Sequence, residues 1–398
     1  MNQKILKSIG WPRVMLGDQK IATMGSGGTP SRQNAEYFKG KILWVKSGEL
    51  KEAMITDTEE KISTVALNNS SAKIFPRNTV LIAMYGATVG RTAILGADAA
   101  TNQAVCGIIT NPKMLLPEYL FYYLQSKKNF LIGKSIGGAQ PNISQTVIRH
   151  LEVPLPPIEA QKHIASILER AEQLKEKRKK ANELLAKLPQ SVFLEMFGNL
   201  NNFEQTKCEE LCENISVGIV IKPSKYYREN GVPALRSLNI KPNKFNLENL
   251  VFVSEADNNS KIIKSRLNKG DIVMVRTGYP GTSAVVDDNL AGANCIDLII
   301  LRPKKELVNP YFLANYLNSD FYKAKIAANK RGIAQQHFNI GSVKKSLIPL
   351  IKISAQNEFV EQVRKVEILI EHQKSCEREL SFLFESLLQK AFNGKMGA

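Results

Sequence analysis

The chain has 398 residues, of which 43% are hydrophobic, and a formal net charge of +17 at pH 7. This length is too great for one ordinary core, so at least two domains are expected. No membrane span, signal peptide, disulfide framework or zinc site is expected, because long apolar runs and paired cysteine spacings are absent and the 5 cysteines and 4 histidines are scattered.

The first predicted domain, Met1–Glu152, alternates short strands with turns and ends in helices. Apolar, β-prone runs at Leu43–Ser47, Asn78–Ala83 and Ala104–Ile109 are typical of strands. Pro117 then opens an amphipathic helical stretch, since proline suits the first turn of a helix. The mixture predicts an α+β domain.

The next segment, residues 153–197, is predicted to be one long helix that begins after the prolines at 154, 156 and 157. From Ile158 to Leu188 this helix would be about 46 Å long at 1.5 Å per residue. Apolar residues at alternating spacings of three and four predict a coiled-coil seam. That seam contains Ile164, Ile167, Ala171, Leu174, Arg178, Leu185 and Leu188.

The second half of the chain repeats the first. Residues 198–347 are predicted to form a second α+β domain, and residues 348–398 a second long helix. Adding 195 to a position in the first helix gives its match in the second, as in Pro154 and Pro349 or Gln161 and Gln356. Such a constant offset indicates a duplicated structural unit. The matching seam contains Phe359, Val366, Leu369, Gln373, Leu380 and Leu383.

Both seams are interrupted by a polar residue at the same depth, Arg178 in the first and Gln373 in the second. A polar residue at a matched core position is a known way to fix register. The shared defect therefore favours two long antiparallel helices packed on each other over two unrelated surface helices. The predicted fold is two α+β domains separated by this helix pair, with an internal pseudo-two-fold repeat.

The positive charge is concentrated in the two domains rather than in the helices. Residues 1–152 carry a net charge of +8 and residues 198–347 a net charge of +7. The two helical segments carry +2 and 0. Two similar basic domains joined by nearly neutral helices suggest two equivalent contacts with a polyanion.

Catalytic motifs are not convincing in this sequence. The stretch Gly86–Thr92 resembles a phosphate-binding loop but has the wrong spacing, with arginine in place of lysine. The stretch Asn309–Phe312 resembles a motif that holds a flipped base in amino-methyltransferases. The first copy has Leu116–Tyr119 at that place, so the shared feature is a proline opening a helix.

Several motifs resemble those of one known family. They are Trp11 with Leu16–Asp18, then Gly28–Ser31, then Gln140–Ser144 leading to Val153–Pro157, and Ser386–Phe392 near the end. With the double order of domain and helix, they cover nearly the whole chain. The sequence is similar to the DNA-specificity subunit of a type I restriction–modification system. This resemblance implies two target recognition domains and an antiparallel coiled coil that spaces them and docks modification subunits.

The resemblance also implies a cytoplasmic, non-catalytic subunit that binds double-stranded DNA at a bipartite, asymmetric target. Two modification subunits would bring S-adenosylmethionine, and restriction subunits would bring ATP and Mg²⁺, so no cofactor or metal is expected in this chain. The alternative is a stand-alone DNA methyltransferase or nuclease, which would bind S-adenosylmethionine or cleave DNA by itself. A structural protein with basic patches would show no preference among DNA sequences.

Residues that contact DNA are expected in turns and loops of both domains. Lysine and arginine hold phosphates, whereas arginine, lysine, asparagine and glutamine also read base edges. The candidates in the first domain are Arg32, Lys46, Tyr85, Arg91, Lys134, Gln140 and Asn142. The candidates in the second domain are Lys222, Lys225, Arg236, Arg276, Tyr279, Arg331 and Gln336.

Overall fold

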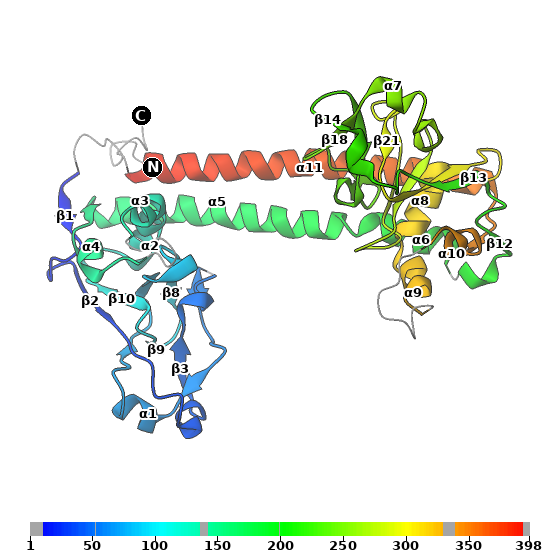
Figure 1. The fold of residues 1–398 in the computed structure, drawn as a ribbon. Coiled ribbons are helices and arrows are strands. Elements are labelled where there is room, and N and C mark those ends of the chain that lie inside the picture. Colours follow the sequence, from blue (N-terminus) through cyan, green and yellow to red (C-terminus); the bar gives the residue numbers. More distant parts are fainter. Residues whose placement is uncertain (1–10, 52, 136–141, 199, 329–338, 393–398) are drawn as a thin grey trace. The chain divides into compact units, whose positions relative to one another are not determined.

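A computed structural model describes residues 11–51, 53–135, 142–198, 200–328 and 339–392 (Figure 1). The chain divides into two compact units. The first comprises Met1–Ala181 together with Gln373–Ala398, and the second comprises Asn182–His372. The divisions fall inside the long helices, so each compact unit contains parts of both, and the predicted boundaries at 152, 197 and 347 stay a prediction.

The first unit contains two sheets. In the larger one the strand order is β2-β10-β7-β8-β4, that is Ala22–Ser26, Val105–Thr110, Val80–Ala83, Thr92–Leu95 and Met54–Ile55. In the smaller one the order is β5-β3-β9-β6, that is Lys61–Ile62, Ile42–Val45, Ala99–Thr101 and Ile74–Phe75. A separate pair joins β1 (Arg13–Met15) to β11 (Glu152–Pro154).

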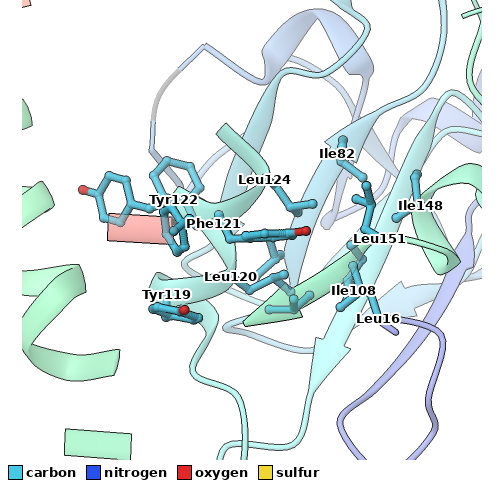
Figure 2. Packing of buried hydrophobic residues seen from close by; sticks show 14 of the residues in the cluster. Leu16, Ile82, Ile108, Tyr119, Leu120, Phe121, Tyr122, Leu124, Ile148 and Leu151 are labelled. Atoms are coloured by element: carbon cyan, nitrogen blue, oxygen red, sulfur yellow. The ribbon is translucent and has the colours of Figure 1, made fainter. Parts of the chain in front are cut away.

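Helices cover the larger sheet of the first unit. The short helices of this unit are α1 (Thr64–Asn68), α2 (Pro117–Ser126), α3 (Lys128–Gly133), α4 (Gln145–Arg149) and the 3-10 helices η2 (Ala35–Phe38), η3 (Ser47–Glu49) and η4 (Gly86–Thr88). Figure 2 shows side chains of α2, among them Leu120 and Leu124, beside Ile82 and Ile108 of the sheet. All four are less than 1% exposed, so this helix–sheet contact is the centre of the core.

The second unit repeats this plan. One sheet has the order β13-β22-β19-β20, that is Cys212–Val217, Leu298–Pro303, Ile272–Val275 and Ser283–Val285. Another has the order β14-β18-β15-β21, that is Tyr227–Arg228, Val251–Val253, Val232–Leu235 and Asn294–Cys295. Two further pairs join β12 (Gln205–Lys207) to β23 (Leu347–Pro349) and β16 (Ile240–Lys241) to β17 (Lys244–Phe245).

The remaining helices of the second unit are α6 (Leu188–Phe197), η5 (Leu200–Asn202), η6 (Pro223–Tyr226), η7 (Ser237–Asn239), α7 (Glu255–Asn258), η8 (Ile263–Ser265), α8 (Pro310–Asn318), α9 (Asp320–Ala328) and α10 (Ile340–Lys344). The run β22-β19-β20 reproduces β10-β7-β8, and α8 opens on a proline as α2 does. The predicted α+β class and the internal repeat are confirmed.

Two glycines at matching places allow strands to approach closely. A Cβ atom on Gly27 would lie 1.9 Å from the carbonyl oxygen of Thr101, and one on Gly218 would lie 2.4 Å from that of Cys295. Thr101 and Cys295 occupy equivalent parallel pairings, with Val45 and Leu235 respectively. Any side chain here would push a strand out of its sheet.

Replacement of Gly27 by alanine is therefore expected to lower the free energy of unfolding by at least about 2 kcal/mol, since the clash involves backbone rather than a flexible side chain. Gly25 is the matched control, because it lies in the same stretch and a Cβ there meets nothing within 4 Å. Urea denaturation of both variants measures the difference. Equal stability of Gly27→Ala and Gly25→Ala would contradict this assignment.

The first long helix is shorter than predicted. Helix α5 covers Ile158–Leu185, and α6 then starts at Leu188 with Pro189 in its first turn. Proline lacks the amide hydrogen that a continuing helix needs, so the chain breaks there and restarts. The second copy has Phe384 at the equivalent place, and α11 runs unbroken over Ile353–Phe392, 40 residues or about 60 Å.

The buried sides of both long helices differ from the predicted seam at four of its thirteen positions. Leu174, Leu188, Leu369 and Leu383 are 56%, 37%, 44% and 53% exposed, so these four assignments are wrong. The less exposed positions follow Ile164 at spacings of four then three, rather than three then four. They are Leu168, Ala171, Lys175, Arg178, Asn182 and Leu185 in α5, and Phe359, Val363, Val366, Ile370, Gln373, Glu377, Leu380 and Phe384 in α11.

The parts of α5 and α11 in the first unit lie antiparallel (Figure 1). Arg178 Nη1 donates a hydrogen bond to Gln373 Oε1, so the two matched polar residues meet as predicted. Further along, Lys175 Nζ lies 4.7 Å from the ring centre of Phe384. Residues in the last turns of α11 then enter the core of the first unit beside Ile164 and Leu168 of α5; they are Phe384, Leu388, Ala391 and Phe392.

Each unit is completed by the helix that follows the other domain in the sequence. In the first unit, Phe392 of α11 packs against Tyr119 of α2, with ring centres 5.1 Å apart. In the second unit, Phe197 of α6 packs in the same way against Phe312 of α8, with ring centres 5.5 Å apart. Phe359, from the start of α11, joins this second aromatic cluster at 5.7 Å from Phe197.

A buried glutamine near the start of each long helix ties it to its own domain. Gln161 is 0% exposed; its Oε1 accepts from the Leu116 amide at 2.9 Å, and its Nε2 donates to the carbonyl groups of Met114 at 2.8 Å and Pro156 at 2.9 Å. Leu116 is the N-cap residue of α2, and its apolar side chain forms no capping hydrogen bond. The glutamine amide therefore supplies the partner for this helix end.

Gln356 repeats the arrangement in the second unit and is 2% exposed. Its Oε1 accepts from the Asn309 amide at 2.8 Å, and its Nε2 donates to the carbonyl groups of Leu307 at 3.2 Å and Ile351 at 2.7 Å. Asn309 caps α8 as Leu116 caps α2. The duplicated glutamine is thus a structural lock between long helix and domain in both copies.

Candidate nucleic-acid interface

Arg32 and Lys46 are brought together at the smaller sheet of the first unit. Arg32 Nη1 lies 2.6 Å from Glu60 Oε2, and Lys46 Nζ lies 3.0 Å from Glu60 Oε1 and 3.0 Å from Glu59 Oε2. Lys46 directly follows β3, and its backbone amide donates to Glu49 Oε2 at 2.7 Å. Two predicted DNA contacts are therefore held in one ion-pair network.

The guanidinium of Arg32 also lies over two rings of the first unit. Its Cζ is 4.3 Å from the ring centre of Phe38 and 5.3 Å from that of Trp44. Trp44 is 1% exposed, and its Nε1 donates to the Gly28 carbonyl at 3.1 Å. Cation–π contacts and the ion pair together hold the Arg32 side chain in place.

The pKa values in this network follow from the ion pairs. The hydrogen bond from Arg32 and then that from Lys46 hold the pKa of Glu60 below its usual range, although burial opposes them. The hydrogen bond to Glu60 raises the pKa of Lys46 against the opposing effect of burial. The side chains of Arg32 and Lys46 are thus paired with the carboxylates of Glu59 and Glu60.

A second candidate group lies on the turn between β7 and β8. Tyr85 is 40% exposed and forms a β-bridge with Asn142, which is also exposed, and the Ile143 amide donates to the Met84 carbonyl at 2.9 Å. The backbone amide of Arg91 closes the turn by donating a hydrogen bond to the carbonyl group of Thr88. Within the described part of the chain the Arg91 side chain has no hydrogen-bond partner.

The last two candidates of the first domain lie further along. Lys134 follows α3, is exposed, and has its Nζ 5.8 Å from the ring centre of Phe130. Gln140 lies outside the described residues.

In the second unit, Arg236 and Arg276 are both half-buried at the ends of core strands. Arg236 Nη2 donates to the Asn249 carbonyl at 2.6 Å, and Arg276 Nη1 lies 2.5 Å from Asp297 Oδ1. The Nε atoms of both arginines are buried without a hydrogen-bond partner among the described residues. A buried donor without a partner is unfavourable, so these guanidinium groups retain unused donor capacity.

Three more candidates of the second unit are on its surface. Lys222 has a left-handed backbone with φ 43° and leads into η6, where Lys225 Nζ lies 4.7 Å from the ring centre of Tyr226. Tyr279, in the turn between β19 and β20, is 84% exposed. Arg331 and Gln336 lie outside the described residues.

The structure therefore brings together two pairs of candidates, Arg32 with Lys46 and Tyr85 with Asn142, and it pairs the candidate Arg276 with Asp297. The acidic partners Glu59, Glu60 and Asp297 were not predicted. Adjacent glutamates at 59 and 60 are visible in the sequence, but the pairing depends on β5 lying beside β3. The left-handed backbone of Asp297, φ 52°, has no sequence signal at all.

The described residues show no feature of a metal site or a membrane span. Within the described ranges, no three histidine, cysteine or acidic side chains are grouped so as to hold a metal ion. None of the helices in that part of the chain is long and apolar enough to cross a membrane. Burial raises the pKa of the Cys106 thiol to about 12, which is opposite to the shift that activates a cysteine nucleophile.

The first part of the chain matches a known family. Residues 9–186 match the model of the type I restriction modification DNA specificity domain. That range covers the predicted first domain from residue 9 onward and the whole of α5.

Two relatives from Methanocaldococcus jannaschii are similar over different lengths. The type I restriction enzyme MjaIX specificity subunit is 32% identical over 49% of this chain and 45% of its own length. The type I restriction enzyme MjaVIII specificity subunit is 24% identical over 91% of this chain and 90% of its own length. The chain thus spans less than half the length of the first relative and most of the second.

A solved structure has the same fold. That structure concerns the complex assembly and conformational transition of the type I R-M system. It matches this chain with a TM-score of 0.69 and 20% identity. The match covers 98% of this chain and 99% of that one. This likeness extends the fold comparison to both units and both long helices.

Proposed function

We propose, on the premise that residues 9–186 belong to the type I restriction modification DNA specificity family, that the whole chain is the DNA-sequence specificity subunit of such a system. It would have no catalytic activity of its own. Each compact unit would read one part of a double-stranded DNA target. It would act in the cytoplasm.

The observation that carries this proposal is that the two units repeat the same strand order but have different residues in the equivalent turns. Thr92 pairs with Ile82 in the first unit as Ser283 pairs with Met274 in the second, so Arg91 and Thr282 hold equivalent places. The equivalent turns thus carry a half-buried arginine in one unit and a buried threonine in the other, so the two surfaces differ there. Identical surfaces would read a palindrome, whereas unlike side chains read unlike sequences.

The expected target is therefore bipartite and asymmetric, with an unread spacer between its two parts. Each good bidentate contact to a base edge contributes about 1–3 kcal/mol of discrimination. Mapping methylated adenines across the host genome by single-molecule sequencing, with and without this chain, tests the proposal. A continuous or palindromic motif that depends on the chain would contradict it.

Partner subunits are proposed to dock on the long helices. Several large apolar side chains lie on helix faces away from the seam and are strongly exposed: Leu184, Ile368 and Phe382 at 69%, 65% and 75%. Isolated apolar residues are normal on a surface, but a helix pair in a multi-subunit complex needs such contacts. Modification subunits would bring S-adenosylmethionine, and restriction subunits ATP and Mg²⁺.

The variant Phe382→Gln is expected to reduce the amount of modification subunit that co-purifies with this chain, because it removes a large exposed apolar contact from α11. The chain itself should remain folded, since the side chain is 75% exposed. Leu307→Gln, at a 42% exposed position outside the long helices, is the control. Undiminished co-purification with Phe382→Gln would count against docking at this face.

The variant Arg91→Glu is expected to weaken DNA binding at low salt at least tenfold, because Arg91 is half-buried in an exposed turn and has no described side-chain partner to lose. Arg276→Glu should also weaken binding, but it would place a carboxylate beside Asp297 and disturb folding. Fluorescence anisotropy with target DNA measures both. Parent-like binding by Arg91→Glu would remove Arg91 from the interface.

A further inference from the structure

A pocket of about 520 Å³ opens on the first unit, at the junction of β1, β11, α2, α3 and α4. Its volume is in the usual range for small-ligand pockets, about 300–1,000 Å³. Three cations from separate elements line it: Arg13 of β1, Lys127 between α2 and α3, and Lys134 after α3. The ring of Phe130 and the imidazole of His150 also line it.

One carboxylate, that of Glu152, also lines the pocket, against three cations. Among the described residues, Arg13, Lys127 and Lys134 form no ion pair, in contrast to Arg32 and Lys46. Lys127 Nζ lies instead over the ring of Tyr123, 5.5 Å from its centre. Burial, and then the positive charge of Arg13, lower the pKa of Lys127.

The fold itself does not require a basic pocket here, as the second unit shows. Gln205 takes the place of Arg13 opposite the matched proline, and its Nε2 donates to the Leu200 carbonyl at 3.0 Å. Asp320 takes the place of Lys127 after the equivalent helix, and its Oδ2 accepts from Gln190 at 2.8 Å. Neither substitute is a cation, although the Oε1 of Gln205 is buried without a hydrogen-bond partner among the described residues.

We propose that this pocket binds a phosphate group and that the site is particular to the first unit. Lysine and arginine side chains that converge repel one another, and a dianion among them would turn this repulsion into attraction. Arginine presents two parallel N–H donors that match phosphate oxygens, and lysine adds a compact charge. Three cations against the one carboxylate of Glu152 leave positive charge in the pocket that an anion can neutralise.

Two sources of the phosphate share this chemistry: the backbone of bound DNA, and a free phosphate or phosphorylated small molecule. The phosphate site stands on the geometry of the first unit alone. Only the DNA source rests on the proposed function.

The test uses the full chain and inorganic phosphate, observed by ³¹P NMR line broadening. Saturable broadening is expected for the parent, and Arg13→Gln and Lys127→Gln should each weaken binding at least tenfold. Lys113→Gln removes one exposed lysine outside the pocket and should bind like the parent. Acetate at equal ionic strength should not displace the phosphate. Thermal unfolding followed by circular dichroism checks that both pocket variants remain folded.

No saturable binding by the parent, parent-like binding by both folded pocket variants, or equal displacement by acetate would each overturn the proposal. A salt series with target DNA then identifies the source. If the DNA backbone supplies the phosphate, the slope of log affinity against log salt should fall in magnitude by about 0.9 in Lys127→Gln. An unchanged slope with lost phosphate binding assigns the site to a free phosphate. Absence of DNA binding by the parent would defeat the proposed function and leave the phosphate result unaffected.

Discussion

Ending the chain at Ser381 should unfold the first unit, even though almost all of that unit's own residues remain. The deletion removes Phe384, Leu388, Ala391 and Phe392, each at most 4% exposed in the core of the first unit. Burying one large apolar side chain stabilises by about 1.5–3 kcal/mol, so the three largest contribute roughly 5–9 kcal/mol. That is comparable to the whole stability of a typical domain, about 5–15 kcal/mol.

Hydrogen exchange followed by mass spectrometry measures this effect within each unit. Amides of β7 and β10 should lose protection in the shortened chain. A chain that ends at Phe392 is the matched control, because it keeps all four core residues and should retain parent-like protection. Full protection of the first unit after truncation at Ser381 would show that α11 does not complete its core.

Replacement of Gln161 by leucine should lower the free energy of unfolding by about 2–4 kcal/mol, since it leaves one amide and two carbonyl groups without partners. Leucine is close in volume, so a cavity contributes little. Gln356→Leu should have a similar effect in the second unit. Urea denaturation, with hydrogen exchange to locate the weakened unit, measures both changes.

Gln173→Leu is the control for this pair, because Gln173 lies on the same helix but is exposed, and its one side-chain hydrogen bond, at 3.4 Å to Glu169, is also exposed. It should change stability by less than about 0.5 kcal/mol. A loss as large for Gln173→Leu as for Gln161→Leu would mean that the buried amide has no special role.

The sequence predicts the repeat well, because duplication leaves matched residues at a constant offset. Pro154 and Pro349, and Arg178 and Gln373, hold equivalent places in the structure. Gln161 and Gln356 are recognisable as a pair in the same way. Their role is not, since their partners, such as Leu116 and Asn309, lie more than forty residues earlier.

The buried side of the long helices is harder to predict from the sequence, because apolar residues also occupy exposed positions. Leu174 is apolar but exposed, whereas its neighbour Lys175 lies on the contact side and places its ammonium over Phe384. A lysine stem covers apolar surface while its charge remains outside the core. Pro189 is a sequence signal for the break before α6, but the duplicated pattern around it favours one continuous helix.

The candidate interface could be predicted only as residue types in turns. Arg32 and Lys46 are basic in the sequence, yet their charges are balanced by Glu59 and Glu60 across neighbouring strands. Conversely, the convergence of Arg13 and Lys127, which form no ion pair among the described residues, becomes apparent only when β1 and the end of α2 are placed around one pocket. Pairing across strands decides which cations are available, and single-residue reasoning does not include it.

The contribution of α11 to the first unit also sets an order of events during protein synthesis. The ribosome releases residues 11–181 long before Phe384 and Phe392 exist, so the nascent first unit carries an uncovered apolar face around Tyr119. The second unit has no such delay over most of its length, because its residues 182–372 form one continuous stretch. Since domains generally fold as units while they are made, the half synthesised second should reach its native packing first. The half synthesised first should wait for the final helix, exposed to chaperones in the meantime.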